Sequence, residues 1–180
     1  MFRPPTFALP LQEIVFWRGA FLHYYSTVEH ATNDLLLRAL ASGEYRRTGK
    51  MPRSWAGRLR LLGRLFDEPG LLHPFATRWR DLLTSLTFVE KDRHLLTHGM
   101  LNAEMNEAKE LTLTFTAYDF HHERRETLTK TVDEMRYLVG RFGDEAEAYL
   151  ILIAEILKAT RFDILPVGPL QPLPREPRDF

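Results

Sequence analysis

Residues 10–41 read PLQEIVFWRGAFLHYYSTVEHATNDLLLRALA, which is the pattern of one long helix. Apolar residues recur at steps of three, four or seven, as on one face of an α-helix; they are Ile14, Trp17, Phe21, Val28 and Leu35. The pair Ser42-Gly43 then ends the pattern. A helix of about 30 residues is ~45 Å long. We therefore predict that this helix forms the backbone of a helical bundle.

One carboxylate lies within the apolar side of this predicted helix. Glu29 is seven residues from both Leu22 and Leu36, so the three side chains share one line along the helix. We expect Glu29 to be partly buried, and a buried charge needs a partner. An arginine is the natural partner, and we predict Arg93.

The segment after the first helix is strongly basic. Residues 45–66 carry seven lysines and arginines and no acid. Pro52 indicates a loop, and Ser54 can cap a helix that follows it. Five of the basic residues could bind an RNA backbone, namely Arg46, Arg47, Lys50, Arg53 and Arg58. The alternative interpretation is a solvated loop with an exposed helix face.

The second half of the chain changes its period twice. A helix is expected after Pro69-Gly70, around Leu72 to Leu86. From residue 110 leucine and phenylalanine alternate with threonine, which predicts a strand with one buried face. A second strand near residues 125–129 would complete a small β-hairpin insert at 110–129. Thr131 and Glu134 form a capping box for a last helix to about residue 161.

Length and composition indicate one domain, and the helices predicted above make it a mostly α bundle. The chain has 180 residues, of which 44% are hydrophobic, so it can bury a sizeable core. We assign residues 1–165 to a single helical domain and residues 166–180 to a proline-rich extended tail.

Charge and cysteine content exclude several kinds of site. The net charge is zero, so any attraction to nucleic acid must come from a local patch. Without cysteine there is no disulfide, thiolate zinc site or cysteine nucleophile, which suits a reducing cytoplasm. We find neither a clear signal-peptide core nor an apolar run of the ~20 residues that a membrane span needs. Phosphate-binding glycine loops are absent too, so no cofactor is expected.

Residues 93–99 read RHLLTHG and carry the chemistry of interest. We expect a short helical turn here, with Asp92 as its cap and Gly99 closing it as a left-handed C′ residue. Arginine binds phosphate through a planar fork of donors, and histidine exchanges protons near neutral pH. His94 and His98 are four residues apart, but the HExxH pattern of a zinc helix is absent. A second Arg-x4-His match, Arg18 to His23, lacks the following glycine. We interpret that second match as chance.

The heptapeptide resembles the signature of HEPN domains, which are helical dimers that in many cases cut RNA without a metal. The order of a long first helix with an inward acid, a helical pair, the motif and a closing helix is also similar to that family, so the resemblance implies a HEPN-like helical bundle. The resemblance implies that Arg93 contacts phosphate, His98 is the acid–base residue and His94 supports them. It also matches Glu29, by position alone, to an acid on the first helix. The family often has asparagine where this chain has His94.

Two hypotheses of different classes follow. The first is a metal-independent endoribonuclease of toxin–antitoxin or phage-defence type, with Arg93 and His98 acting in a site shared by a homodimer. Such an enzyme leaves 2′,3′-cyclic phosphate ends, and an antitoxin would be its protein partner. The second is a non-catalytic HEPN-like dimerisation module that binds a nucleotide or a partner protein. In the module, Arg93 would serve only to hold two helices together.

Overall fold

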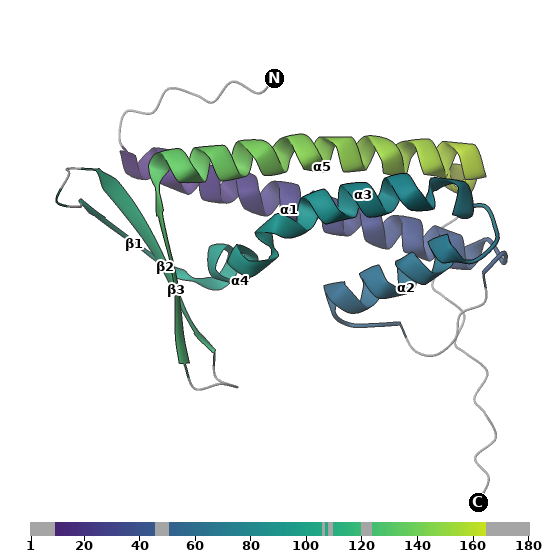
Figure 1. Ribbon diagram of the computed structural model, residues 1–180, viewed down its shortest axis with the longest axis horizontal. Coiled ribbons are helices and arrows are strands. Elements are labelled where there is room, and N and C mark those ends of the chain that lie inside the picture. Colours follow the sequence, from purple (N-terminus) through teal and green to yellow (C-terminus); the bar gives the residue numbers. More distant parts are fainter. Residues whose placement is uncertain (1–9, 46–50, 106, 108–109, 120–123, 165–180) are drawn as a thin grey trace, which may run out of the picture. The chain divides into compact units, whose positions relative to one another are not determined.

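The computed structural model describes residues 10–45, 51–105, 107, 110–119 and 124–164 (Figure 1). Within these residues the chain is mostly helical, with five α-helices and one small antiparallel sheet, as the sequence predicts. The chain divides into two compact units. The first unit comprises Met1–Ser26 and Thr84–Glu147, and the second comprises Thr27–Leu83 and Ala148–Phe180.

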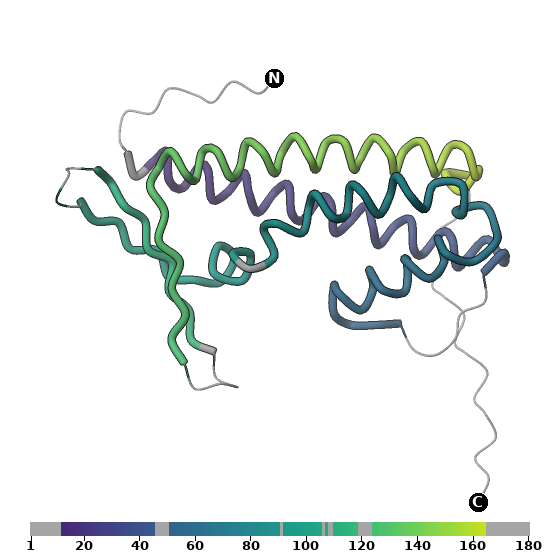
Figure 2. The backbone as a smooth tube through the Cα atoms, viewed as in Figure 1, coloured from purple at the N-terminus to yellow at the C-terminus, as the bar shows by residue number. Residues whose placement is uncertain are grey.

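The two longest helices contribute to both units. Helix α1 (Pro10–Ala41) has the bounds that its apolar stripe predicts, and helix α5 (Val132–Thr160) closes the fold. Each is one uninterrupted coil in Figure 2. The predicted capping box opens α5: the Glu134 amide donates to Thr131 Oγ1 at 3.1 Å, and the Thr131 amide donates to Glu134 Oε2 at 2.7 Å.

The first unit contains a sheet with the strand order β1-β2-β3. The strands are β1 (Met100–Met105), β2 (Leu111–Asp119) and β3 (Arg124–Thr131). The predicted hairpin is present as β2 and β3, and the prediction was incomplete because β1 pairs with β2 as a third strand. Strand β1 was not predicted because most of its residues are exposed, so buried and exposed side chains do not alternate along it.

Strand β2 extends beyond its partner β1. The pairing of β1 with β2 ends at Met100 and Thr116, whereas the pairing of β2 with β3 continues to Asp119. Leu113 and Phe115 are fully buried on one face of β2. The alternate residues point to the other face.

Aromatic packing holds the helices of the first unit together. On α1, Phe21 is fully buried, and its ring centroid lies 5.2 Å from that of Phe142 on α5. Helix α4 (Glu90–His98) adds the buried Leu95 and Leu96 to this unit. The motif is therefore anchored through its apolar positions.

The second unit contains α2 (Trp55–Asp67) and most of α3 (Ala76–Leu86), which a 3-10 turn at His73–Phe75 precedes. Ser54 caps α2 as predicted, accepting a hydrogen bond of 3.1 Å from the Gly57 amide. In the core the Tyr149 hydroxyl lies 2.8 Å from Thr32 Oγ1 and accepts a hydrogen bond of 3.2 Å from Trp79 Nε1. This buried polar group is thus fully engaged.

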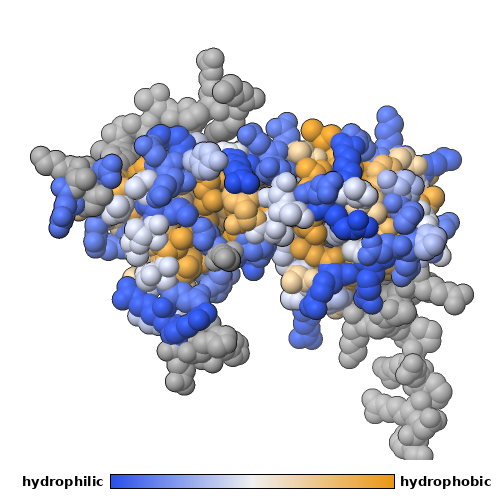
Figure 3. All heavy atoms as spheres, viewed as in Figure 1, coloured by the Kyte–Doolittle hydropathy of each residue, from blue (hydrophilic) through white to orange (hydrophobic). Residues whose placement is uncertain are grey.

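The surface is mixed in character. On the face seen in Figure 3, apolar residues appear between polar ones. Among the described residues several large apolar side chains are exposed, including Met100, Met105, Tyr118 and Tyr137. No helix in the described part of the chain has both the length and the apolar character needed to cross a bilayer.

Candidate site around the histidine pair

Helix α4 carries the whole motif, and its ends differ from expectation. Asp92 was predicted to cap the helix, but the helix begins two residues earlier, at Glu90, and its N-cap is Val89. Asp92 lies in the first turn instead, where its carboxylate pairs with Lys130 Nζ of β3 at 3.1 Å. An acid is favourable there because the amide ends of a helix carry partial positive charge.

Gly99 ends α4, but not through the left-handed conformation that was expected. Its backbone is extended, with φ −67° and ψ 140°, and its amide donates to the Leu95 carbonyl at 2.8 Å. A Cβ at this position would overlap the Leu95 carbonyl oxygen and lie 3.2 Å from Phe115 Cβ. The glycine of the motif is therefore required by close packing and not by backbone dihedrals.

Arg18 holds the C-terminal end of α4. Its Nε donates to the Leu96 carbonyl at 2.9 Å, and its Nη2 donates to the carbonyls of Thr97 at 3.2 Å and Gly99 at 2.9 Å. These carbonyls lack partners within the helix, and a cation also suits the negative end of the helix dipole. The arginine of the second Arg-x4-His match thus has a structural use.

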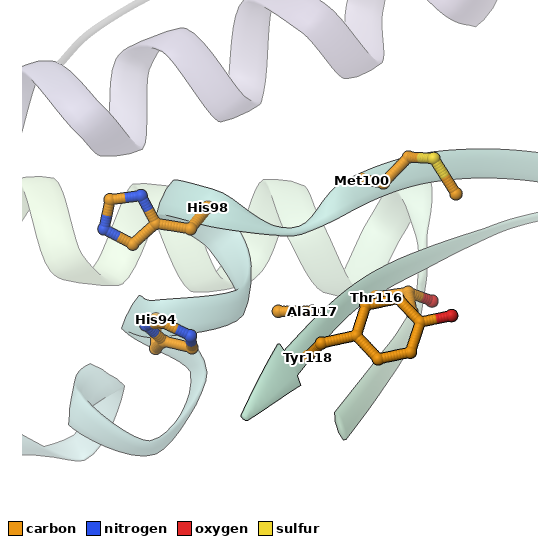
Figure 4. A pocket seen from close by; sticks show the side chains of 6 residues that line it. All are labelled: His94, His98, Met100, Thr116, Ala117 and Tyr118. Carbon is orange, nitrogen blue, oxygen red and sulfur yellow. The ribbon is translucent and has the colours of Figure 1, made fainter. Parts of the chain in front are cut away.

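His94 and His98 form an exposed pair one helical turn apart. Their ring centroids are 5.3 Å apart with an angle of 54° between the rings. Both border an open pocket of about 500 Å³, lined also by Met100, Thr116, Ala117 and Tyr118. Figure 4 shows the two imidazoles on one side of Ala117 and the Tyr118 ring on the other.

Arg93 points away from this pair. Five residues along a helix correspond to a rotation of about 140°, so Arg93 and His98 lie on different faces of α4. The Arg93 guanidinium pairs with Glu90 at 3.3 Å and lies 5.1 Å from the ring centroid of Tyr25, whose hydroxyl donates to Glu90 at 3.3 Å. The structure therefore brings His94 and His98 together in the pocket, and Arg93 is not among its lining residues.

The predicted partner of Glu29 is wrong. Glu29 is partly buried as expected, with 33% of its side chain exposed, but it pairs with Arg58 of α2 in the second unit. Arg58 also donates to the Arg53 carbonyl at 2.6 Å. The carboxylate does need an arginine, and the helix that follows in the chain supplies it in place of α4.

The predicted RNA-binding stretch is only partly described. Arg46, Arg47 and Lys50 lie outside the described residues, as does the proline-rich tail. Of the remaining two candidates, Arg53 is exposed and Arg58 is engaged by Glu29.

Two residues beside the pocket were missed by sequence reasoning. Tyr118 is 63% exposed and lines the pocket. Arg125 on β3 donates a hydrogen bond of 3.5 Å to Thr116 Oγ1, which lines the same pocket and is only 7% exposed. No local motif marks these residues, because they come beside the pocket through the pairing of β2 with β3 and the packing of α4 against both strands.

Comparison with known proteins identifies no relative of this chain. No family model, curated protein or solved structure matches the chain. Within the described residues, no three His, Cys, Asp or Glu side chains are grouped as a metal site would require.

Proposed function

We propose that this protein is a metal-independent endoribonuclease whose acid and base are His98 and His94. The observation that carries the proposal is the pair of exposed imidazoles, 5.3 Å apart between ring centroids, at the edge of an open pocket. Cleavage of RNA by its own 2′-hydroxyl needs one group to accept a proton and another to donate one. A single chain offers both.

The proposed reaction is a transesterification. One neutral imidazole takes the proton of the 2′-hydroxyl, and the oxygen attacks the adjacent phosphorus. The bond from phosphorus to the 5′-oxygen breaks, and the other imidazole, in its protonated form, gives that oxygen a proton. The products are a 2′,3′-cyclic phosphate and a 5′-hydroxyl, and the two histidines finish with exchanged protonation states.

Charge also builds on the phosphate and needs a cation. The HEPN resemblance assigns this role to Arg93 and implies a homodimer with a shared site. In a two-fold dimer each copy brings its own α4 to the shared interface, and the Arg93 of the second copy would supply the cation by exchanging its contact with Glu90 for the phosphate. The toxin or phage-defence setting, a protein antitoxin and a cytoplasmic location belong to the same proposal.

The test is cleavage of a mixed RNA pool in the presence of EDTA. The wild type, His94→Ala, His98→Ala and the matched control His30→Ala, an exposed histidine on α1, are compared. We expect 2′,3′-cyclic phosphate ends from the wild type and the control, and a loss of about 10²-fold or more in both pocket variants. Full cleavage by folded His98→Ala would contradict the proposal.

One observation favours a non-catalytic HEPN-like module instead. The Arg93 guanidinium is already engaged by Glu90 and Tyr25, as in a purely structural tie. In such a module Arg93→Ala costs about 1 kcal/mol of stability, since the pair is partly exposed, and the wild type cuts no RNA. In the enzyme the same variant also lowers the cleavage rate of the folded protein, measured well below its melting temperature.

A further inference from the structure

The β2–β3 side of the histidine pocket carries two groups that acid–base chemistry does not use. Tyr118 presents a ring that is 63% exposed, and the register places Arg125 of β3 directly opposite it. Residues directly opposite on antiparallel strands have side chains on the same face, with Cβ atoms about 5 Å apart. An aromatic ring and a guanidinium therefore lie together beside the pocket.

The Arg125 guanidinium is tied to the pocket itself. It donates to Thr116 Oγ1 at 3.5 Å, and Thr116 is 7% exposed while lining the pocket with His94 and His98. One hydrogen bond leaves other donors of the five on an arginine available. Arginine suits phosphate because its planar fork can make two parallel hydrogen bonds.

From this arrangement we propose that Tyr118 and Arg125 bind single-stranded RNA at the histidine pocket. A base stacks on the Tyr118 ring, and a neighbouring phosphate binds Arg125. This inference rests on the proposed ribonuclease function and names the residues that hold its substrate. Base stacking on exposed aromatic rings and cationic contacts to the backbone are the usual means of binding single strands.

The geometry also favours a single strand over a duplex. Figure 4 places the Tyr118 ring and the two imidazoles on opposite sides of Ala117, so a bound strand would pass over Ala117 between them. A base can stack on a protein ring only when it is unstacked from its neighbours, which a loop or single strand permits.

The experiment measures binding separately from cleavage. A fluorescent 2′-O-methyl RNA, about 12 nucleotides long, cannot be cleaved because it lacks the 2′-hydroxyl that would attack. Its affinity is measured by anisotropy over a range of salt concentrations, for the full chain and its variants. Two matched controls are Tyr137→Ala, which removes another exposed tyrosine, and Arg124→Ala, which removes the neighbouring arginine.

We expect Tyr118→Ala to weaken binding about 10-fold, with Tyr118→Phe close to the wild type. Arg125→Ala should weaken binding and reduce the slope of log affinity against log salt by about 0.7, the value for one phosphate contact on a single strand. Arg125→Lys should keep that slope. The control variants should bind as the wild type does, and a duplex of the same sequence should bind more weakly.

Three outcomes would overturn the inference: no binding by the wild type at low salt, equal affinities for Tyr118→Ala and Tyr137→Ala, or equal salt slopes for Arg125→Ala and Arg124→Ala. Cleavage is scored in parallel on ordinary RNA. If binding depends on Tyr118 and Arg125 but no RNA is cleaved, the ribonuclease proposal is contradicted and the binding site stands. If RNA is cleaved but binding does not depend on these two residues, the binding site is contradicted and the ribonuclease proposal stands.

Discussion

Arg18 of α1 donates a hydrogen bond of 2.9 Å from Nη2 to the backbone carbonyl of Gly99, the last residue of the motif. Through this bond and two others from the same guanidinium, the first helix holds the turn that leads from α4 into β1. The backbone segment that carries His98 is therefore positioned by Arg18, which lies 80 residues earlier in the chain.

Replacing Arg18 should destabilise the protein. In Arg18→Ala three carbonyl oxygens lose a charged donor, and we expect the free energy of unfolding to fall by about 2 kcal/mol. Arg18→Lys keeps the charge but cannot reach the carbonyls with a fork, so it should recover less than half of the loss. Urea denaturation measures both, with Arg60→Ala as an exposed control. An unchanged midpoint for Arg18→Ala would show that the three bonds contribute nothing.

Tyr149→Phe should destabilise the core of the second unit. Its hydroxyl accepts a hydrogen bond from Trp79 Nε1, and without it this buried donor is left without a partner. The expected cost is about 1–3 kcal/mol, measured by urea denaturation at pH 7. Tyr137→Phe, at a tyrosine that is 71% exposed, should cost close to nothing. Equal urea midpoints for the two variants would contradict the stabilising hydrogen bond between Trp79 and the Tyr149 hydroxyl.

The same tyrosine predicts a loss of stability in alkali. Burial raises the pKa of Tyr149, and the hydrogen bonds with Thr32 and Trp79 only partly offset this effect. The folded state therefore keeps the phenolic proton at a pH where the unfolded state, with a pKa of about 10, has released it. The free energy of unfolding should fall as the pH rises above that value. Tyr149→Phe should show a shallower fall, and identical slopes would argue against the buried hydroxyl.

Glu13 gives the opposite dependence in acid. The hydrogen bond from the Trp17 indole lowers the pKa of Glu13, burial opposes this, and the hydrogen bond and charge of Arg136 lower it further. Because the folded pKa lies below the unfolded one, the stabilisation is present above about pH 4.3 and is lost as the pH falls through the folded pKa.

The variant Glu13→Gln isolates this contribution. Its free energy of unfolding should be lower than that of the wild type at pH 7, and this difference should shrink as the pH falls below about 4. Glu147→Gln, at an exposed glutamate on α5, is the control for a general change in charge. A difference that stays constant with pH would rule out a depressed pKa in the folded protein.

Local patterns in the sequence were enough to predict most of the elements. The bounds of α1 follow from its apolar stripe, and the caps at Ser54 and Thr131 follow from short-range hydrogen bonding. Strand β1 could not be found in this way. Its side chains are mostly exposed on both faces, so burial imposes no alternation, and only pairing with β2 makes it a strand.

Side-chain partners were harder to predict than elements. The need of Glu29 for an arginine follows from its position on the apolar line, but the choice of Arg58 over Arg93 depends on tertiary packing. The same holds for Arg18, because a guanidinium that binds backbone carbonyls leaves no trace in the sequence of the segment it binds. The sequence spacing of His94 and His98 predicts that they share one helical face, whereas nothing in the sequence predicts that Tyr118 and Arg125 lie beside them.

Helix α4 has nine residues, fewer than the ~12–15 that an isolated helix needs to be even marginally stable in water. The distance between the two imidazoles therefore depends on tertiary contacts: the burial of Leu95 and Leu96, the ion pair of Asp92 with Lys130 at one end, and the hydrogen bonds of Arg18 at the other. Because few residues hold α4, we expect these contacts to open locally and the pair to separate while the long helices remain folded. The histidine pair should consequently be lost on warming, or in mild denaturant, before the fold itself melts.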